Sequence, residues 1–129
     1  MKKATSLQDL AARYTYAWCS QDPAKVAAFY AKGGSISVNG GRPTPIVEVA
    51  RGFMRDFPDV VVTFDKLKKT PNGTEFYWTL TGTHAGTGNR IRISGYELWK
   101  IDNAGLIAES KGHFDAADYD RQLEKRGNS

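Results

Sequence analysis

The spacing of apolar residues changes from a helical period to a period of two at about Val60, and this change most constrains the fold. Beyond Val60, alternating apolar and polar residues predict four strands separated by Pro-Asn-Gly and glycine-containing turns. The predicted strands are Val60 to Lys69, Thr74 to Ala85, Arg90 to Ile101 and Leu106 to Asp115. Short turns between consecutive strands favour an antiparallel meander. Because most of these strands approach or exceed about ten residues, against a usual five or six, we expect a twisted sheet with a concave face.

Three helices are predicted before the meander. Apolar residues recur at helical spacing from Leu7 to Trp18, with Ser6 as the N-cap. Asp22-Pro23 begins a second helix that runs to about Ala31, and Thr44-Pro45 begins a third that runs to about Phe57, with a short strand from Ser35 to Val38 between them. Amphipathic helices can cover the concave face of the sheet. The sequence therefore predicts a cone-shaped α+β fold, in which three N-terminal helices and a strongly curved antiparallel sheet enclose a pocket.

The chain of 129 residues has room for a single domain, residues 1–129, with a frayed tail over about residues 125–129. No apolar run is long enough to span a membrane, and Met1-Lys-Lys is not followed by the apolar core of a signal peptide. We therefore expect a cytoplasmic protein that does not bind membranes. The formal net charge is +4, but the basic residues are scattered, and the one cluster, Lys66 to Lys69, lies on a strand where alternate side chains point to opposite faces. This pattern predicts no nucleic-acid partner.

No motif for a cofactor or metal is convincing. The chain has one cysteine, Cys19, which suits a small buried side chain at the end of the first helix. The glycine pairs Gly33-Gly34 and Gly86-Thr87-Gly88 lack the flanking elements and lysine of a phosphate-binding loop. We therefore predict no metal and no cofactor.

The last strand is rich in ionisable residues, and the hairpin registers predict where they point. The turn from Gly86 to Asn89 sets His84 opposite Ile91, and the turn at Asn103-Ala104-Gly105 pairs Asp102 with Leu106. In this register the odd-numbered residues of the last strand share the concave face with Glu97 and His84. These residues are Glu109, Lys111, His113 and Asp115. A one-residue bulge in this hairpin would move every side chain beyond it to the opposite face.

A group of carboxylate, imidazole and ammonium side chains in one pocket can abstract a proton next to a carbonyl and stabilise the resulting enolate. The candidate catalytic residues are Glu97, His113, Asp115, His84 and Lys111. Structural roles compete with this interpretation. His84 can simply line the end of a strand, Asp115 can cap the helix that begins near Ala116, and Glu97 with Lys111 can form an ordinary cross-strand ion pair.

Aromatic residues of the helices and the sheet are expected to form the pocket wall, which suits a small apolar or aromatic molecule. The candidate ligand-binding residues are Tyr14, Trp18, Phe29, Phe53, Phe57 and Trp78. The opposite face of the sheet combines aromatic and hydroxyl side chains and suits a homodimer interface. Its members are Tyr77, Thr79, Thr81, Tyr96 and Leu98.

Several short motifs along nearly the whole chain resemble one family. They are Tyr16-Ala-Trp18 with Gln21-Asp22-Pro23, Phe57-Pro58-Asp59, Gly82-Thr-His-Ala-Gly86, Ser94-Gly95, and Phe114-Asp115 with Gln122-Leu123. Together they resemble the nuclear transport factor 2-like superfamily, in particular its SnoaL-like polyketide cyclase branch. The resemblance implies a ketosteroid isomerase-like fold but not one activity, because the superfamily includes isomerases, dehydratases, epoxide hydrolases and non-enzymatic binding domains.

In the cyclase branch, the resemblance implies an acid-base pair made by a histidine on the penultimate strand and an aspartate on the last strand. Here the histidine position falls on Glu97, and the aspartate position falls on or next to Gly112. The pair is therefore not retained. We expect a pocket for a small hydrophobic molecule, which supports either a cofactor-independent isomerisation, cyclisation or dehydration or, as the alternative, non-enzymatic ligand binding or dimerisation.

Overall fold

The computed structural model describes residues 6–125 and has an α+β architecture with four helices and a six-stranded sheet. The helices are α1 (Leu7–Trp18), α2 (Pro23–Ala27), α3 (Ile46–Asp56) and α4 (Ala116–Glu124). The two short strands are β1 (Ser35–Val38) and β2 (Thr44–Pro45). The four long strands are β3 (Val61–Thr70), β4 (Gly73–Thr83), β5 (Arg90–Ile101) and β6 (Ile107–Phe114).

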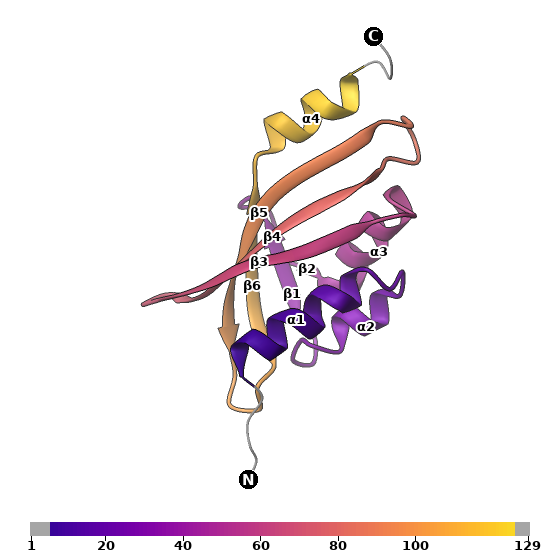
Figure 1. Cartoon of the computed structure of the whole chain (residues 1–129). Coiled ribbons are helices and arrows are strands. Elements are labelled where there is room, and N and C mark those ends of the chain that lie inside the picture. The colour runs from indigo at the N-terminus through magenta and orange to yellow at the C-terminus, as the bar shows by residue number, and fades with distance from the viewer. Residues whose placement is uncertain (1–5, 126–129) are drawn as a thin grey trace.

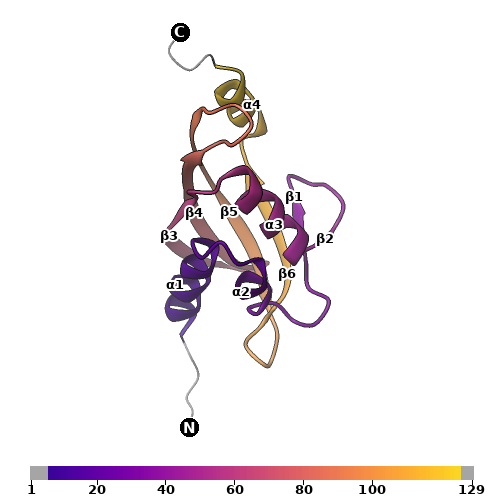
Figure 2. The same ribbon diagram turned by 90° about the vertical axis from the view of Figure 1, so that its right-hand side faces the viewer.

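The sheet order is β2-β1-β6-β5-β4-β3, so the predicted meander forms one continuous part of the sheet. The helices α1, α2 and α3 lie on one side of the twisted long strands, and α4 lies beside the end of β5 (Figure 1, Figure 2). The sheet is antiparallel as predicted except at one position, where β1 pairs in parallel with β6. This pairing makes β6 an interior strand, with neighbours on both sides.

The caps of the first two helices agree with the sequence prediction. Ser6 accepts a hydrogen bond from the Asp9 amide at 3.0 Å, and Asp22 accepts one from the Ala24 amide at 3.0 Å. The second helix is shorter than predicted, because the chain leaves it after Ala27 and the Ala31 amide donates to Ile107 on β6. The third helix begins after Pro45, since Thr44–Pro45 pairs with β1 instead. None of the helices within residues 6–125 is both long enough and apolar enough to cross a membrane.

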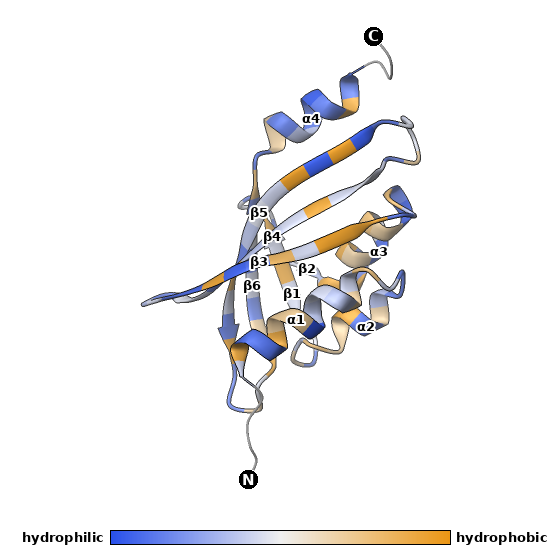
Figure 3. Cartoon of the chain, viewed as in Figure 1, coloured by the Kyte–Doolittle hydropathy of each residue, from blue (hydrophilic) through white to orange (hydrophobic). Residues whose placement is uncertain are grey.

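Alternation along the long strands separates the two faces of the sheet, and it is clearest on β5, where polar and apolar residues alternate (Figure 3). Ile91, Ile93 and Trp99 are buried, whereas Arg92 and Lys100 are exposed. The buried face of the sheet packs against the apolar faces of the helices, which include Leu10, Ala11, Tyr14, Ala50 and Met54. This burial supplies the main driving force for folding.

The β4–β5 hairpin keeps the predicted faces but shifts the pairing by two residues. Gly82, rather than His84, lies opposite Ile91, and Thr83–Arg90 is the last pair before the loop. His84 lies in that loop, where its Nδ1 accepts from the amides of Gly86 at 3.2 Å and Thr87 at 3.1 Å. A shift of two preserves the side-chain alternation, so the buried face is the one that the sequence predicts.

The β5–β6 hairpin contains the one-residue irregularity that reverses the predicted facing. Ile101 lies opposite Ile107 as the turn predicts, but Lys100 lies opposite Glu109, so the register shifts by one. Beyond this bulge, Ser110 and Gly112 face the interior, and Lys111 is exposed. The prediction for the odd-numbered residues is therefore wrong. The physical reason is burial: the predicted register would remove several ionisable side chains from water, whereas the observed one buries a serine and a glycine.

Candidate active site around Glu97

Glu97 on β5 is a buried carboxylate, with 5% of its surface exposed, and its side chain accepts hydrogen bonds from four other residues. Its Oε1 accepts from Trp99 Nε1 at 2.8 Å, Ser110 Oγ at 3.0 Å and the Tyr14 hydroxyl at 3.0 Å. The Tyr30 hydroxyl donates to the same oxygen at 3.3 Å. Its Oε2 accepts only from Tyr14, at 3.2 Å, among the described residues. Oε2 is therefore the oxygen with spare capacity for a ligand or a proton.

Each donor reaches Glu97 through the local structure of its own element. Trp99 lies two residues further along β5 and so points to the same face, and Ser110 lies opposite Trp99 on β6. Tyr14 lies on the buried face of α1. Tyr30 follows α2 and is held in place because its two neighbours pair with Ile107, through the Phe29 carbonyl and the Ala31 amide.

Burial sets the protonation of this group. Desolvation raises the pKa of Glu97, and the hydrogen bonds from Trp99, Tyr14, Ser110 and Tyr30 oppose that rise. Desolvation, together with the nearby Glu97 charge, also raises the pKa values of Tyr14 and Tyr30 well above 10.0. Both phenols therefore stay protonated at neutral pH and act as donors. Glu97 is the group in this cluster that can exchange a proton, which suits it to general acid or base chemistry.

The carboxylate lines a cavity of about 50 Å³, which we call the Glu97 cavity. Apart from Glu97, its lining residues are apolar or glycine. The buried ones are Trp18, Ile36, Val62, Phe76, Leu80 and Gly112. The partly exposed ones, which form the rim, are Val38, Val49, Phe53, Trp78 and Phe114. An engineered apolar cavity of about 150 Å³ admits benzene, so a ring-sized ligand requires the rim side chains of the Glu97 cavity to move apart.

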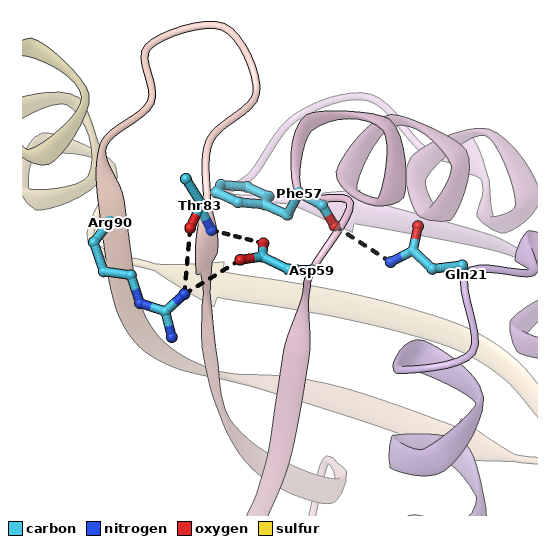
Figure 4. A network of polar contacts seen from close by, with 5 residues as sticks. All are labelled: Gln21, Phe57, Asp59, Thr83 and Arg90. Carbon is cyan, nitrogen blue, oxygen red and sulfur yellow. Dashed lines mark hydrogen bonds and ion pairs between the residues drawn. The ribbon is translucent and has the colours of Figure 1, made fainter.

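A polar network fixes the end of α3 that carries Phe53 at the rim. Asp59 accepts from the Thr83 amide at 2.8 Å and pairs with Arg90 at 3.3 Å, while Gln21 donates to the Phe57 carbonyl at 3.3 Å (Figure 4). The hydrogen bond from the Thr83 amide is the main cause of the lowered pKa of Asp59. These contacts tie the turn after α3 to β4 and β5, so the position of the rim is linked to the sheet.

The predicted ligand-binding residues fall into two groups. Trp18, Phe53 and Trp78 line the Glu97 cavity. The other three do not line it, because they pack in neighbouring layers of the core. Tyr14 bonds to Glu97, Phe29 packs edge-on against Tyr14 at 5.8 Å, and Phe57 contacts the His84 ring at 5.5 Å.

Of the five predicted catalytic residues, only Glu97 lines the cavity. Lys111 is exposed and lies 3.8 Å from Glu109, so the predicted ion pair with Glu97 is wrong. His113 packs against Tyr96 on the outer face of the sheet, with ring centroids 4.9 Å apart. Asp115 caps α4 by accepting from the Asp118 amide at 3.0 Å, and His84 organises its own loop. The bulge explains why Lys111 and His113 point away from the cavity, and local hydrogen bonds explain why Asp115 and His84 have structural roles instead.

Sequence reasoning did not identify Tyr30, Trp99 and Ser110 as partners of Glu97. Trp99 could have been predicted as a partner, because it lies two residues from Glu97 on the same strand and so points to the same face. Ser110 becomes recognisable only once the bulge is known, and Tyr30 only once α2 is known to end at Ala27. Within residues 6–125, no three His, Cys, Asp or Glu side chains lie together in a way that could hold a metal ion.

Several solved structures share this fold at low sequence identity. A protein of Catenulispora acidiphila DSM 44928 with a ketosteroid isomerase-like fold, solved in complex with trimethylamine, gives a TM-score of 0.79 at 13% identity, covering 94% of this chain and 96% of that one. IdmH of Streptomyces antibioticus, a proposed polyketide cyclase, gives a TM-score of 0.76 at 20% identity, covering 94% of this chain and 100% of that one. A proposed polyketide cyclase of Acidithiobacillus ferrooxidans gives a TM-score of 0.75 at 19% identity, covering 95% of this chain and 97% of that one.

The sequence itself is more informative about the family. No curated protein matches it. The model of the SnoaL-like polyketide cyclase family matches residues 8–123, which include all four helices except the ends of α1 and α4, and the whole sheet. The positions where the resemblance places the cyclase histidine and aspartate, Glu97 and Gly112, lie directly opposite each other on β5 and β6. The chain belongs to the SnoaL-like polyketide cyclase family.

Proposed function

We propose that the protein binds a small, uncharged, largely apolar molecule in the Glu97 cavity and that Glu97 transfers a proton to or from it without a cofactor. The observation that carries this proposal is a single buried carboxylate in an otherwise apolar cavity, with one oxygen that, among residues 6–125, accepts a hydrogen bond only from Tyr14. A raised pKa makes such a carboxyl a better base near neutral pH than an exposed one. Isomerisation, cyclisation and dehydration are the reaction classes that this chemistry supports.

The reaction begins with a substrate that has an acidic C–H bond next to a carbonyl. The ionised Glu97 takes the proton, the C–H electron pair moves into the enolate, and the protonated Glu97 returns the proton to the same or another atom. The solved relatives described as proposed polyketide cyclases support a carbonyl-rich substrate class. The reaction does not use the histidine–aspartate pair implied by the cyclase branch, because Glu97 and Gly112 occupy those positions.

Deuterium exchange tests this proposal without knowledge of the natural substrate. Small ketones such as cyclopentanone are incubated with the protein in D2O, and the loss of the proton signals next to the carbonyl is followed by NMR. We expect the wild type to accelerate exchange above the buffer rate and Glu97→Gln to lose the acceleration. Glu109→Gln is the matched control, because Glu109 is exposed and lies on the neighbouring strand. Its exchange rate should equal that of the wild type.

Non-enzymatic ligand binding is the second candidate, and the saturation of Glu97 Oε1 favours it. Four donors surround that oxygen, so the carboxylate can serve mainly to join α1, the segment after α2, β5 and β6. A ketone that binds in the cavity without any exchange above the buffer rate would support this candidate and contradict proton transfer.

A further inference from the structure

The wall of the Glu97 cavity includes bare backbone at Gly112, in the interior of β6. Gly112 is buried, lines the cavity and lies directly opposite Glu97 on β5. Glycine weakens the interior of a strand, because it has no side chain to pack and loses much conformational freedom when the chain folds. Such a glycine commonly marks a backbone conformation that other residues avoid, a close approach of another backbone, or a place where a ligand comes close.

The backbone conformation at position 112 does not require glycine. Within residues 6–125, five glycines have a positive φ angle, and Gly112 is not one of them. Those five are Gly33, Gly40, Gly73, Gly88 and Gly105. Because φ is negative at Gly112, which lies within a regular strand, alanine can adopt the same conformation.

Close packing does not require glycine there either, as a comparison with Gly95 shows. Gly95 lies on β5, two residues from Glu97 and on the same face, and a Cβ atom at position 95 would overlap the carbonyl oxygen of His113. At position 112 the nearest atom to an added Cβ would be Ile36 Cδ1, at 3.3 Å, and Glu97 Cγ would lie at 3.9 Å. Both are side-chain atoms, and Cδ1 is the flexible end of its side chain. A methyl group would therefore fit at position 112 after a small movement.

A ligand is the remaining reason for glycine at this position. The space that a side chain at position 112 would fill belongs to the Glu97 cavity and adjoins the carboxylate whose Oε2, among residues 6–125, accepts a hydrogen bond only from Tyr14. Ile36 on β1 lies on one side of this space, and Glu97 on β5 lies on the other. Because an added Cβ would contact both side chains, the space is as wide as a single carbon atom. It suits a flat or unbranched apolar group and excludes a branched one.

We propose that Gly112 is a specificity-determining residue of the Glu97 cavity and that a flat or unbranched apolar group of the ligand lies directly against its backbone, beside Glu97. This inference rests on the proposed function and adds the shape of the ligand at its reacting end. A side chain at position 112, even a methyl group, fills the space beside the carboxylate and weakens binding.

Benzene and cyclohexane test the shape of the space on the wild-type protein. Benzene is flat, whereas cyclohexane is puckered and thicker. A ligand that binds the folded protein stabilises it, so the rise in the urea midpoint with ligand concentration gives the Kd of each compound. Burial of apolar area alone would favour cyclohexane, which has the larger surface. We expect the opposite order, with cyclohexane binding at least about 5-fold more weakly, because extra atoms are forced into a filled space.

Gly112→Ala tests the residue itself, with Gly52→Ala as its matched control. Gly52 lies on α3 outside the cavity lining, and a Cβ atom there would meet only the end of the Arg55 side chain, at 4.0 Å. Both variants should be at least as stable in urea as the wild type. We expect Gly112→Ala to bind benzene at least about 5-fold more weakly and Gly52→Ala to bind it like the wild type. Adding Ile36→Val to Gly112→Ala removes the Cδ1 atom nearest the new methyl group and should restore part of the affinity.

Four outcomes would overturn the proposal. They are equal benzene affinity in Gly112→Ala and the wild type, a clear loss of stability in Gly112→Ala, cyclohexane binding as tight as that of benzene, and no benzene binding at millimolar concentration. A loss of stability counts because it would show that packing requires the glycine. The single variant Ile36→Val keeps Gly112 and widens the space, so it should reduce the preference for benzene, and an unchanged preference would also contradict the proposal.

The test separates this inference from the proposed proton transfer. Ketone exchange in D2O, together with benzene binding that Gly112→Ala leaves unchanged, would overturn this inference alone. Weaker benzene binding in Gly112→Ala, together with no ketone exchange in the wild type, would contradict only proton transfer by Glu97.

Discussion

Glu97 and Gly112 form a directly opposed pair on β5 and β6, and the missing side chain of Gly112 leaves space beside the Glu97 carboxylate. A Cβ atom at position 112 would lie 3.9 Å from Glu97 Cγ and 3.3 Å from Ile36 Cδ1. The first distance is ordinary contact, and the second requires a small movement at the flexible end of Ile36. The site can thus accept a short side chain at the position where the family resemblance implies an aspartate.

The first prediction concerns Gly112→Asp, with Gly112→Ala as its matched control. The new carboxyl would lie beside the buried Glu97, and two neighbouring acids raise each other's pKa. A raised pKa in the folded state gives stability that is present at low pH and is lost as pH rises. We therefore expect Gly112→Asp to be less stable than Gly112→Ala at pH 7 by at least about 1.4 kcal/mol, the equivalent of one pKa unit. Urea denaturation at about pH 4 should show a smaller gap, and equal stability at pH 7 would contradict the prediction.

The second prediction concerns the pH dependence of stability that Glu97 causes. Burial raises the pKa of Glu97 in the folded state above the value of about 4.3 in an unfolded chain. Its contribution to stability is therefore complete below that value and falls as pH rises through the folded-state pKa. The stability of the wild type relative to Glu97→Gln should fall with increasing pH, by at most about 1.4 kcal/mol per pH unit. Chemical denaturation between about pH 4 and pH 8 measures this difference, and a difference that grows with pH would refute the assignment.

A companion variant separates charge from hydrogen bonding at the same position. Glu97→Leu removes the acceptor and leaves the donors of Trp99 and Ser110 without it in the core. One tyrosine hydroxyl also loses its acceptor, because Tyr14 and Tyr30, whose oxygens lie 2.9 Å apart, can satisfy only one proton between them. Each unpaired buried donor costs about 1–3 kcal/mol, so the loss should exceed about 3 kcal/mol at every pH. A loss no larger than that of Glu97→Gln would mean that the hydrogen bonds contribute little.

The sequence predicts the parts of this fold that depend on neighbouring residues. The Ser6 and Asp22 caps and the strand from Ser35 to Val38 follow from local chemistry, and the limits of the long strands are correct within about two residues. The facing of β6 does not follow in this way. The Asn103–Gly105 turn fixes the pairing of Asp102 with Leu106, but the bulge beyond it depends on which side chains the whole sheet buries.

The candidate site is predictable to a similar extent. The pairing of β4 with β5 differs from the prediction by two residues, which leaves every side chain on its predicted face. The alternation of polar and apolar residues is therefore enough to predict that Glu97 and Trp78 point to the interior. Lys111 and His113 lie beyond the one-residue shift between β5 and β6, so alternation assigns their side chains to the wrong face of the sheet. The donors Tyr30 and Ser110 come together with Glu97 only through contacts between distant segments, which no short window of sequence contains.

The third prediction distinguishes the structural role of Asp115 from a catalytic one. Asp115 is exposed and caps α4 through the Asp118 amide. Asparagine is as good a residue as aspartate at the N-cap of a helix, whereas alanine is a poor one. We expect Asp115→Ala to lower the free energy of unfolding by about 0.5–2 kcal/mol and Asp115→Asn to leave it nearly unchanged. Neither substitution should change ketone exchange in D2O. A loss of exchange in Asp115→Asn would identify the carboxylate as part of the site.

The outer face of the sheet carries a row of stacked rings. Tyr77 and Tyr96 stack with centroids 5.3 Å apart, and Tyr96 packs on His113 at 4.9 Å. Beside them, the Thr79 hydroxyl bonds to Ser94 at 2.8 Å and to Asp65 at 2.7 Å. The helices α1, α2 and α3 lie on the other side of the sheet (Figure 2).

The fourth prediction follows from this surface: we propose that two copies of the chain form a homodimer through the outer face. A row of aromatic and hydroxyl side chains can bury apolar area and still satisfy its polar groups at an interface. Light scattering should give a mass of twice 14.3 kDa for the wild type, and Tyr96→Lys should give a monomer because each copy would bring a positive charge into the proposed interface. Tyr16→Lys is the matched control, since Tyr16 is 80% exposed on α1, and it should remain dimeric. A monomeric wild type at all concentrations, or dissociation of both variants, would contradict an interface on this face.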